Sequence, residues 1–184
     1  MNKKTIEDNK NKVLQLIDEI KREGINDLKE YLINSDFFVA PASTRYHGAE
    51  KGMLCQHSLN VVMSFLKFKE DANDKILLNK ESCIICGLFH DLCKINKYSG
   101  ACAPYLYNSV EKGQALLSIK TIEKYIKLTV EEKLAIKYHM GVWGCYEFSR
   151  LKGEYSFMEY VEALNINSVF FLHISDMIAA RLLE

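Results

Sequence analysis

Apolar residues recur at helical spacing along most of this chain, while the apolar–polar alternation typical of strands is almost absent. The predicted helices cover residues 5–22, a short segment through 28–32, then 54–68, about 75 or 80 to 94, 114–127, 129–140 and about 157 or 166 to 183. Gly24 is expected to end the first helix, and Thr129-x-x-Glu132 is a capping box that opens the helix over 129–140. The pattern predicts an all-α fold, a bundle of roughly six to eight helices.

Length and composition fit one globular domain. The 184 residues, 48% hydrophobic and 26% charged, suit a single domain spanning 1–184. A chain of this size buries enough surface to fold without a disulfide or a structural metal.

The charge balance and the absence of targeting signals limit which partners and which compartment we expect. Lys plus Arg equals Asp plus Glu, at 24 each, so broad binding of nucleic acid is not expected and a long nucleic acid is a poor candidate partner. The polar start MNKKTIEDNK excludes the apolar core of a signal peptide, and no stretch approaches the roughly 18 apolar residues of a membrane span, so no membrane partner is expected. Six cysteines without an export signal favour reduced thiols in a cytoplasmic protein.

Cys83-x-x-Cys86 admits a zinc or a redox interpretation, but both cysteines lie in a predicted apolar helix, where cysteine behaves as a small hydrophobic residue. No second CxxC is present, and a thioredoxin-like motif needs a preceding strand. Packing is therefore the favoured interpretation of this pair.

His90 and Asp91 are adjacent in the most apolar predicted helix of the chain. Burying an imidazole beside an ionised carboxylate is costly unless a partner compensates. A divalent cation compensates both groups, because neutral histidine and anionic aspartate are natural ligands of such ions. Lys94 follows one turn later and faces the same opening, where its ammonium group is well placed to meet a phosphate oxygen.

His57 and Asp176 lie on the apolar faces of two other predicted helices. Groups on separate helices reach the His90–Asp91 pair only in the core of the bundle, as in four-helix metal sites. Taken alone, His57 fits equally well a core histidine bonded to a backbone carbonyl, and Asp176 is either paired or a ligand.

The order His57, His90-Asp91, Asp176 resembles the H…HD…D signature of the HD superfamily of metal-dependent phosphohydrolases. The segments that strengthen the resemblance are LFHDLCK (88–94), KYHMGVWG (137–144), FLHISDMIAA (171–180) and APASTRYHGAEKGMLCQHS (40–58). The last segment is similar to the approach to the first ligand in the HD domains of certain bacterial 3′–5′ exoribonucleases and their single-domain relatives. The resemblance implies an HD-domain core over 36–180, preceded by an N-terminal helical extension over 1–35.

The resemblance also implies a set of metal ligands, which are His57, His90, Asp91 and Asp176. It assigns Lys94 to the scissile phosphate, and it assigns to the metal the activation of a water molecule that attacks phosphorus. Asp91 or a neighbouring histidine would take the proton from that water. The implied activity is hydrolysis of a phosphomonoester or phosphodiester of a nucleotide-like substrate, which is the expected small phosphorylated partner.

One departure from the family bears on the number of metal ions. Two-metal members carry a further histidine midway between the HD pair and the KYHMG-type segment, but LYNSVEKGQALL (106–117) contains none. We therefore expect one divalent ion, with Fe, Mn, Zn, Ni, Co and Mg all open. His139 is then expected to act in catalysis by contacting substrate or a bound water, and Glu111 is a weaker candidate oxygen ligand.

His47, Arg45 and His173 are further candidate substrate-binding residues. His47 and Arg45 lie in the irregular segment before His57, and loops carry function disproportionately, although an exposed loop position explains them nearly as well. His173 precedes Asp176 by three residues and shares its face, but packing beside the core explains it equally well.

The main alternative to an enzyme is a non-catalytic sensor module that keeps the fold and the metal site and binds a nucleotide without cleaving it. Lys94 separates the two hypotheses only weakly, since a sensor would also bind phosphate with a lysine. A two-iron oxygenase is a third hypothesis, and the missing midway histidine counts against it. The sequence leaves open the substrate and the oligomeric state, including a homo-oligomer.

Overall fold

A computed structural model describes residues 1–44, 48–72, 75–100, 104–107, 113–149 and 152–183. The prediction of an all-α fold is confirmed, because these residues form eight α-helices and only one small two-stranded sheet. The helices are α1 (Lys3–Asp18), α2 (Ile25–Asn34), α3 (Met53–Asp71), α4 (Lys80–Phe89), α5 (Gln114–Ile122), α6 (Val130–Tyr138), α7 (Phe157–Ala163) and α8 (Asn167–Ile178), and the strands are β1 (Tyr98–Ser99) and β2 (Leu106–Tyr107). Short 3-10 helices cover Leu92–Lys94 and Gly141–Gly144, and a π-helix over Ala179–Leu183 continues α8.

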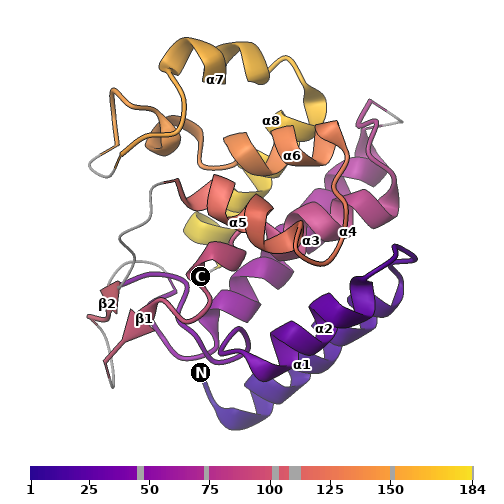
Figure 1. The fold of residues 1–184 in the computed structure, drawn as a ribbon, viewed down its shortest axis with the longest axis vertical. Coiled ribbons are helices and arrows are strands. Elements are labelled where there is room, and N and C mark those ends of the chain that lie inside the picture. The colour runs from indigo at the N-terminus through magenta and orange to yellow at the C-terminus, as the bar shows by residue number, and fades with distance from the viewer. Residues whose placement is uncertain (45–47, 73–74, 101–103, 108–112, 150–151, 184) are drawn as a thin grey trace.

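Four helices, α3, α4, α6 and α8, form the centre of the molecule (Figure 1). Helix α3 packs against α4 and α8, and α6 packs against the same two helices. Helices α1 and α2 lie side by side along one flank, where α1 contacts α3 and α4, while α7 lies at the other end against α6. The carboxyl ends of α4 and α6 therefore reach the interior between α3 and α8.

One large apolar core joins the N-terminal helices to the rest of the chain. Val13 and Ile17 of α1 and Leu28 of α2 are fully or almost fully buried in the same cluster as residues of α3, α4, α6 and α8. Burial of such side chains is worth about 1.5–3 kcal/mol each. A second, smaller cluster around Tyr138 and Tyr155 packs beneath α7.

Helix starts follow local signals in the sequence. The predicted capping box at Thr129 is confirmed, because its side chain accepts a hydrogen bond from the Glu132 amide while the Glu132 carboxylate accepts one from the Thr129 amide. The prediction that Gly24 ends the first helix is wrong, since α1 ends at Asp18 and Gly24 is the N-cap of α2. Gly24 has a φ of 82°, and a Cβ there would clash with the carbonyl group of Tyr125, so this position needs glycine for a contact distant in sequence.

The helix expected to continue to residue 94 ends earlier. Helix α4 stops at Phe89, His90 is its C-cap, and Asp91 leaves the helical region with φ −110° and ψ 21°. A 3-10 turn over Leu92–Lys94 then changes the chain direction. The His90–Asp91 pair therefore lies at a helix end, where the backbone no longer holds the two side chains at a helical angle.

The long tyrosine-bearing segment after this turn contains the small sheet. Strands β1 and β2 pair antiparallel, with Tyr98 opposite Tyr107. The hydroxyl of Tyr98 donates to the carbonyl of Ala42 at 3.1 Å, and the amide of Tyr105 donates to the carbonyl of Thr44 at 2.8 Å. The sheet is thus held against the segment that leads into α3.

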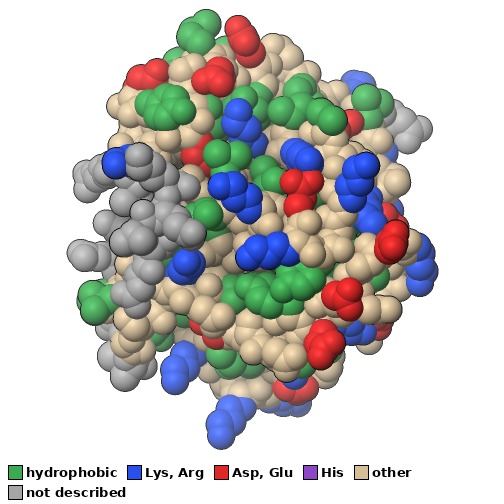
Figure 2. All heavy atoms as spheres, in the orientation of Figure 1, with side chains coloured by type: hydrophobic (Ala, Val, Ile, Leu, Met, Phe, Trp, Pro, Cys, Tyr) green, Lys and Arg blue, Asp and Glu red, His purple; other side chains and the backbone are tan. Residues whose placement is uncertain are grey.

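Basic and acidic side chains are interspersed on the face of the molecule drawn in Figure 2, with apolar patches between them. This mixture agrees with the equal numbers of basic and acidic residues in the chain. Within the described residues no single helix is long and apolar enough to cross a membrane, and only α7 taken with α8 and its π-helical end meets the length and composition test, as a pair bent by 108°.

Candidate metal centre

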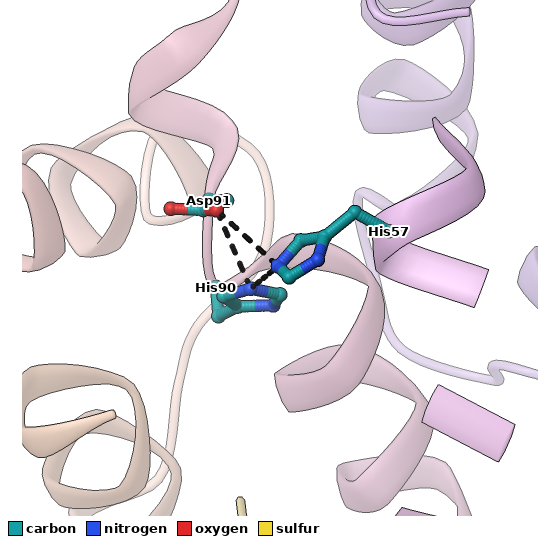
Figure 3. A group of neighbouring side chains, drawn as sticks. All are labelled: His57, His90 and Asp91. Atoms are coloured by element: carbon teal, nitrogen blue, oxygen red, sulfur yellow. Dashed lines mark hydrogen bonds and ion pairs between the residues drawn. The ribbon is translucent and has the colours of Figure 1, made fainter. Parts of the chain in front are cut away.

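His57, His90 and Asp91 form a buried group that could hold a metal ion (Figure 3). Their ligand atoms all lie within 4.8 Å of one another. His57 Nε2 is 3.2 Å from His90 Nε2 and 3.7 Å from Asp91 Oδ2, and His90 Nε2 is 3.5 Å from the same carboxylate oxygen. Helix α3 supplies His57 and the end of α4 supplies the other two, so packing of α3 on α4 assembles the group.

A backbone hydrogen bond orients the His90 ring. Its Nδ1–H donates to the carbonyl of Gly87 at 3.0 Å, which leaves the lone pair on Nε2, the atom that faces His57 and Asp91. Such a bond on the far nitrogen is typical of metal-ligating histidines, because it fixes the tautomer and the ring plane. Burial lowers the pKa of His90, so the neutral, ligating form is favoured.

The absence of a side chain at Gly87 brings the two helices together. A Cβ at Gly87 would lie 2.6 Å from the Cα of Val62, so α4 approaches the backbone of α3 more closely than any other residue would allow. Gly87 is also the residue whose carbonyl receives the His90 ring hydrogen bond. One small residue thus sets both the helix separation and the ring orientation.

Asp176 of α8 lies beside the group. Its Oδ1 is 3.0 Å from His57 Nε2 and 3.9 Å from His90 Nε2. Burial raises the pKa of Asp176, but the neighbouring histidines outweigh it and the pKa lies below its usual value, so the carboxylate is anionic. The structure therefore brings together all four residues that the sequence motif nominated as ligands.

Lys94 projects onto Asp91 from the 3-10 turn. Its ammonium Nζ is 2.7 Å from Asp91 Oδ2. Burial raises the pKa of Asp91, but the charge of Lys94 and the adjacent imidazoles hold it well below the usual range. Burial lowers the pKa of Lys94, but Asp91 together with Tyr98 and Cys93 outweighs burial and the pKa lies above its usual value, so the ammonium group is charged. The Lys94 and Asp176 side chains, 13% and 18% exposed, mark the side of the group that is nearest to solvent.

His139, at the end of α6, faces the group from the other side of Asp91. Its Nδ1–H donates to the carbonyl of Ile136 at 2.6 Å, and its ring lies edge-on to the His90 ring with centroids 4.8 Å apart. His139 Nε2 and Asp91 Oδ1 are 3.8 Å apart, and both are buried atoms without a hydrogen-bond partner among the described residues. Two facing orphan atoms of this kind call for a bound ion or water, because unpaired buried polar groups are rare and costly.

The other candidate substrate-binding residues are placed less directly. His173 of α8 donates from Nδ1 to the carbonyl of His139 at 2.7 Å, and its ring lies against Gly141 and edge-on to Tyr160. This hydrogen bond from His173 holds the backbone at His139. Arg45, His47 and Glu111 lie outside the described residues.

The sequence patterns did not single out the hydroxyl of Tyr107, which is buried and has no hydrogen-bond partner among the described residues. Its place in a tyrosine-rich loop was the only available signal, and that signal fits packing as well as binding. The thiols of Cys83 and Cys86 are free and buried, and they approach the carbonyls of Leu78 and Glu132, at 3.8 and 3.9 Å.

The arrangement fits a divalent cation by its donor set: two imidazole nitrogens and the carboxylate of Asp91, with a second carboxylate adjacent. Comparisons with known proteins identify no relative, since no family model, no curated protein and no solved structure matches the chain.

Proposed function

We propose that the protein is a metal-dependent phosphohydrolase similar to the HD superfamily, which uses one divalent ion to cleave a small nucleotide-like phosphate ester. The observation that carries the proposal is the buried group of His57, His90 and Asp91, whose ligand atoms converge within 4.8 Å. Asp176 would complete the ligand set from α8, since its Oδ1 is 3.0 Å from His57 Nε2. When bound, the ion would polarise a phosphoryl oxygen and lower the pKa of a coordinated water.

The remaining groups of the site suit hydrolysis. Lys94 supplies a buried positive charge for a non-bridging phosphate oxygen. His139 Nε2 and Asp91 Oδ1 lack partners and face each other, so they are the groups that would orient the attacking water and accept its proton. His173 would hold His139 in place through its backbone carbonyl.

The partner that we propose is a small phosphorylated molecule, with a nucleotide as the first candidate, in a cytoplasmic setting and without a membrane or long nucleic acid. Support comes from the balanced charge of the chain, with 24 basic and 24 acidic residues. A homo-oligomer is compatible with this function.

Metal analysis and a hydrolysis screen test the proposal. The purified protein is loaded with Mn, Fe, Co, Ni or Zn, its metal content is measured by mass spectrometry, and p-nitrophenyl phosphate, its bis-ester and a nucleotide panel are offered. Asp91→Asn should remove both metal and hydrolysis. Asp71→Asn is the matched control, because Asp71 is an exposed carboxylate on α3 that pairs with Lys67 at 2.9 Å, away from the metal centre.

The outcomes separate the hypotheses. Close to one ion per chain, with hydrolysis lost in Asp91→Asn and kept in Asp71→Asn, supports the enzyme. Metal without hydrolysis, accompanied by tight nucleotide binding, replaces the enzyme with the sensor module. A chain that retains no metal in any preparation refutes the proposed centre, and two ions per chain would refute its single-ion form.

A further inference from the structure

The C-terminal end of α6 carries His139 and is capped by side chains from two distant segments. The last carbonyl groups of a helix have no partners within that helix. His173 of α8 donates from Nδ1 to the carbonyl of His139 at 2.7 Å, and the hydroxyl of Tyr155, just before α7, donates to the carbonyl of Gly141 at 2.9 Å. The residue whose ring faces the candidate metal centre is therefore held from outside its own helix.

Two glycines of the turn after His139 make room for these caps. Gly141 has a φ of 57°, and a Cβ at this position would overlap the His173 ring. A Cβ at Gly144 would overlap the Tyr155 hydroxyl. Glycine adopts a positive φ without strain and lets a neighbouring group approach the backbone closely. The glycines of the GVWG segment are thus required where the two caps meet the backbone.

Packing holds both capping side chains in place. Tyr155 is fully buried, and its ring centroid is 4.6 Å from that of Tyr138, the last residue of α6. The His173 ring lies edge-on to Tyr160 of α7, with centroids 5.7 Å apart. A hydrogen bond made by a side chain that packing has already immobilised costs little further conformational entropy. The Nδ1–H of His173 is used on the backbone, so it is not free to donate to a substrate phosphate.

Through His139 the cap acts on two unpaired atoms of the candidate metal centre. The Nδ1–H of His139 donates to the carbonyl of Ile136 at 2.6 Å, and its Nε2 lies 3.8 Å from Asp91 Oδ1. Neither Nε2 nor Oδ1 has a hydrogen-bond partner among the described residues. Hydrogen bonding and proton transfer depend steeply on distance and angle, so a shift of the backbone at His139 would misalign Nε2 with Asp91.

We propose that His173 and Tyr155 are positioning residues for His139: they cap the end of α6 and keep Nε2 aimed at Asp91 Oδ1. The inference rests on the proposed function and deepens it. His139 would act on the attacking water and not on the bound ester. Removing either cap should therefore lower kcat and leave KM unchanged, whereas loss of a substrate contact would raise KM.

The kinetic test uses the metal-loaded full chain with p-nitrophenyl phosphate. His173→Leu and Tyr155→Phe each delete one cap and should lower kcat by roughly ten-fold or more, with KM within about two-fold. His173→Asn is the rescue variant, because its side-chain amide places an N–H donor near the position of the histidine Nδ1, and it should recover most of kcat. Tyr146→Phe is the matched control, because it deletes an exposed hydroxyl that donates to the carbonyl of Glu154, away from α6.

Nuclear magnetic resonance of protein with 15N-labelled histidines reads the same positioning without turnover. The Nδ1–H of His139 is buried and bonded to the carbonyl of Ile136, so its proton should exchange slowly with water in the wild type, the control and the rescue variant. In the two cap-deleting variants the exchange should be roughly ten-fold faster or more, because the end of α6 opens more often. The ring N–H of His90, bonded to the carbonyl of Gly87, is the internal control and should keep its wild-type rate if the fold is kept.

The outcomes that overturn the proposal are distinct from failure of the proposed function. A His173→Leu variant with a raised KM, an unchanged kcat and unchanged exchange at His139 makes His173 a substrate contact. A His173→Asn variant as impaired as His173→Leu, or a Tyr155→Phe variant that behaves like Tyr146→Phe, also overturns the proposal.

A wild type that hydrolyses no ester with any metal refutes the phosphohydrolase. In that case faster exchange at His139 in the cap-deleting variants, with slow exchange in His173→Asn, still supports the positioning of His139. Unchanged exchange in all variants refutes both proposals.

Discussion

Arg22 joins the segment after α1 to α6, and its replacement by methionine tests how the N-terminal helices are attached to the body of the protein. The guanidinium donates to both carboxylate oxygens of Glu132, at 2.7 and 3.0 Å, and also contacts Glu81 and the carbonyl of Lys127. The Glu132 side chain is fully buried, while Arg22 is 16% exposed. Arg22→Met keeps much of the aliphatic part of the side chain and removes the charged guanidinium group.

The expected loss of stability follows from the carboxylate that is left behind. Breaking a buried ion pair by removing one partner costs about 3–5 kcal/mol, because the remaining charge is unpaired. The contact to Glu81 is partly exposed to solvent and adds less. For a chain of this size about 1 kcal/mol corresponds to about 2–4 °C in Tm, so Arg22→Met should lower Tm by about 6–20 °C.

Acid should reduce the difference between wild type and Arg22→Met. Burial raises the pKa of Glu132, but hydrogen bonds from Arg22, Ser82 and the Thr129 amide outweigh it, and the pKa lies below its usual value. In the wild type, stability from this group is present above the pKa of the unfolded chain, about 4.3, and is lost as pH falls through the folded value. In the variant, burial is no longer opposed by Arg22, so protonation relieves the unpaired charge and the deficit shrinks as pH falls.

Thermal and urea unfolding followed by circular dichroism at neutral pH and near pH 4 measures both effects. Lys67→Met is the control, because the Lys67–Asp71 pair is exposed and its loss should leave Tm within error. Adding Glu132→Gln to Arg22→Met should restore part of the lost stability. The glutamine side chain can still accept the hydrogen bond from the Thr129 amide at the start of α6, and it carries no charge to be buried. A loss no larger than that of the control, or a deficit that grows in acid, would refute the reasoning.

Three further predictions concern the candidate metal centre and the thiols. Gly87→Ala should lower the free energy of unfolding by about 1–3 kcal/mol and weaken metal binding, because the new Cβ would lie 2.6 Å from the Cα of Val62 and push α4 away from α3. An unchanged Tm with an unchanged metal affinity would contradict the close packing of the two helices. Added Mn or Co should raise the Tm of the wild type in scanning fluorimetry, because a metal concentration of 100 times the dissociation constant adds about 2.7 kcal/mol to the free energy of unfolding. His57→Ala should abolish this rise in Tm. The five described cysteines are buried, and burial raises the pKa of each thiol. The sixth cysteine, Cys102, lies outside the described residues and is replaced by serine for this test. The folded Cys102→Ser protein should show no thiol that reacts with Ellman's reagent near neutral pH, and the unfolded protein should show five.

The local sequence pattern was sufficient to predict those features of the structure that depend on residues close together in the sequence. The helical class, the capping box at Thr129 and the burial of His57 follow from spacing and from short-range hydrogen bonds. The convergence of His57, His90 and Asp91 was also predictable, because polar ligands on apolar helix faces have no other place to meet than the bundle core.

Features that depend on distant contacts were not predictable from pattern. Helix propensity alone favours continuing α4 through Asp91, but the chain turns there and Lys94 closes on the carboxylate. Gly24 was taken as a helix end, and only the carbonyl of Tyr125 explains why that position excludes a side chain. The unpaired hydroxyl of Tyr107 is likewise a property of its surroundings and not of its residue type.

The sequence by itself determined which buried residues could ligate a metal ion, because residue type and apolar context decide what can bind a metal and what must be buried. The tertiary structure decided how those residues are aimed: the backbone carbonyls that orient the His90 and His139 rings, the orphan atoms left between His139 and Asp91, and the pairing of Arg22 with Glu132 across 110 positions. Hydrogen bonds are short and directional, so their partners are fixed only when the packed helices bring distant groups to within about 3 Å.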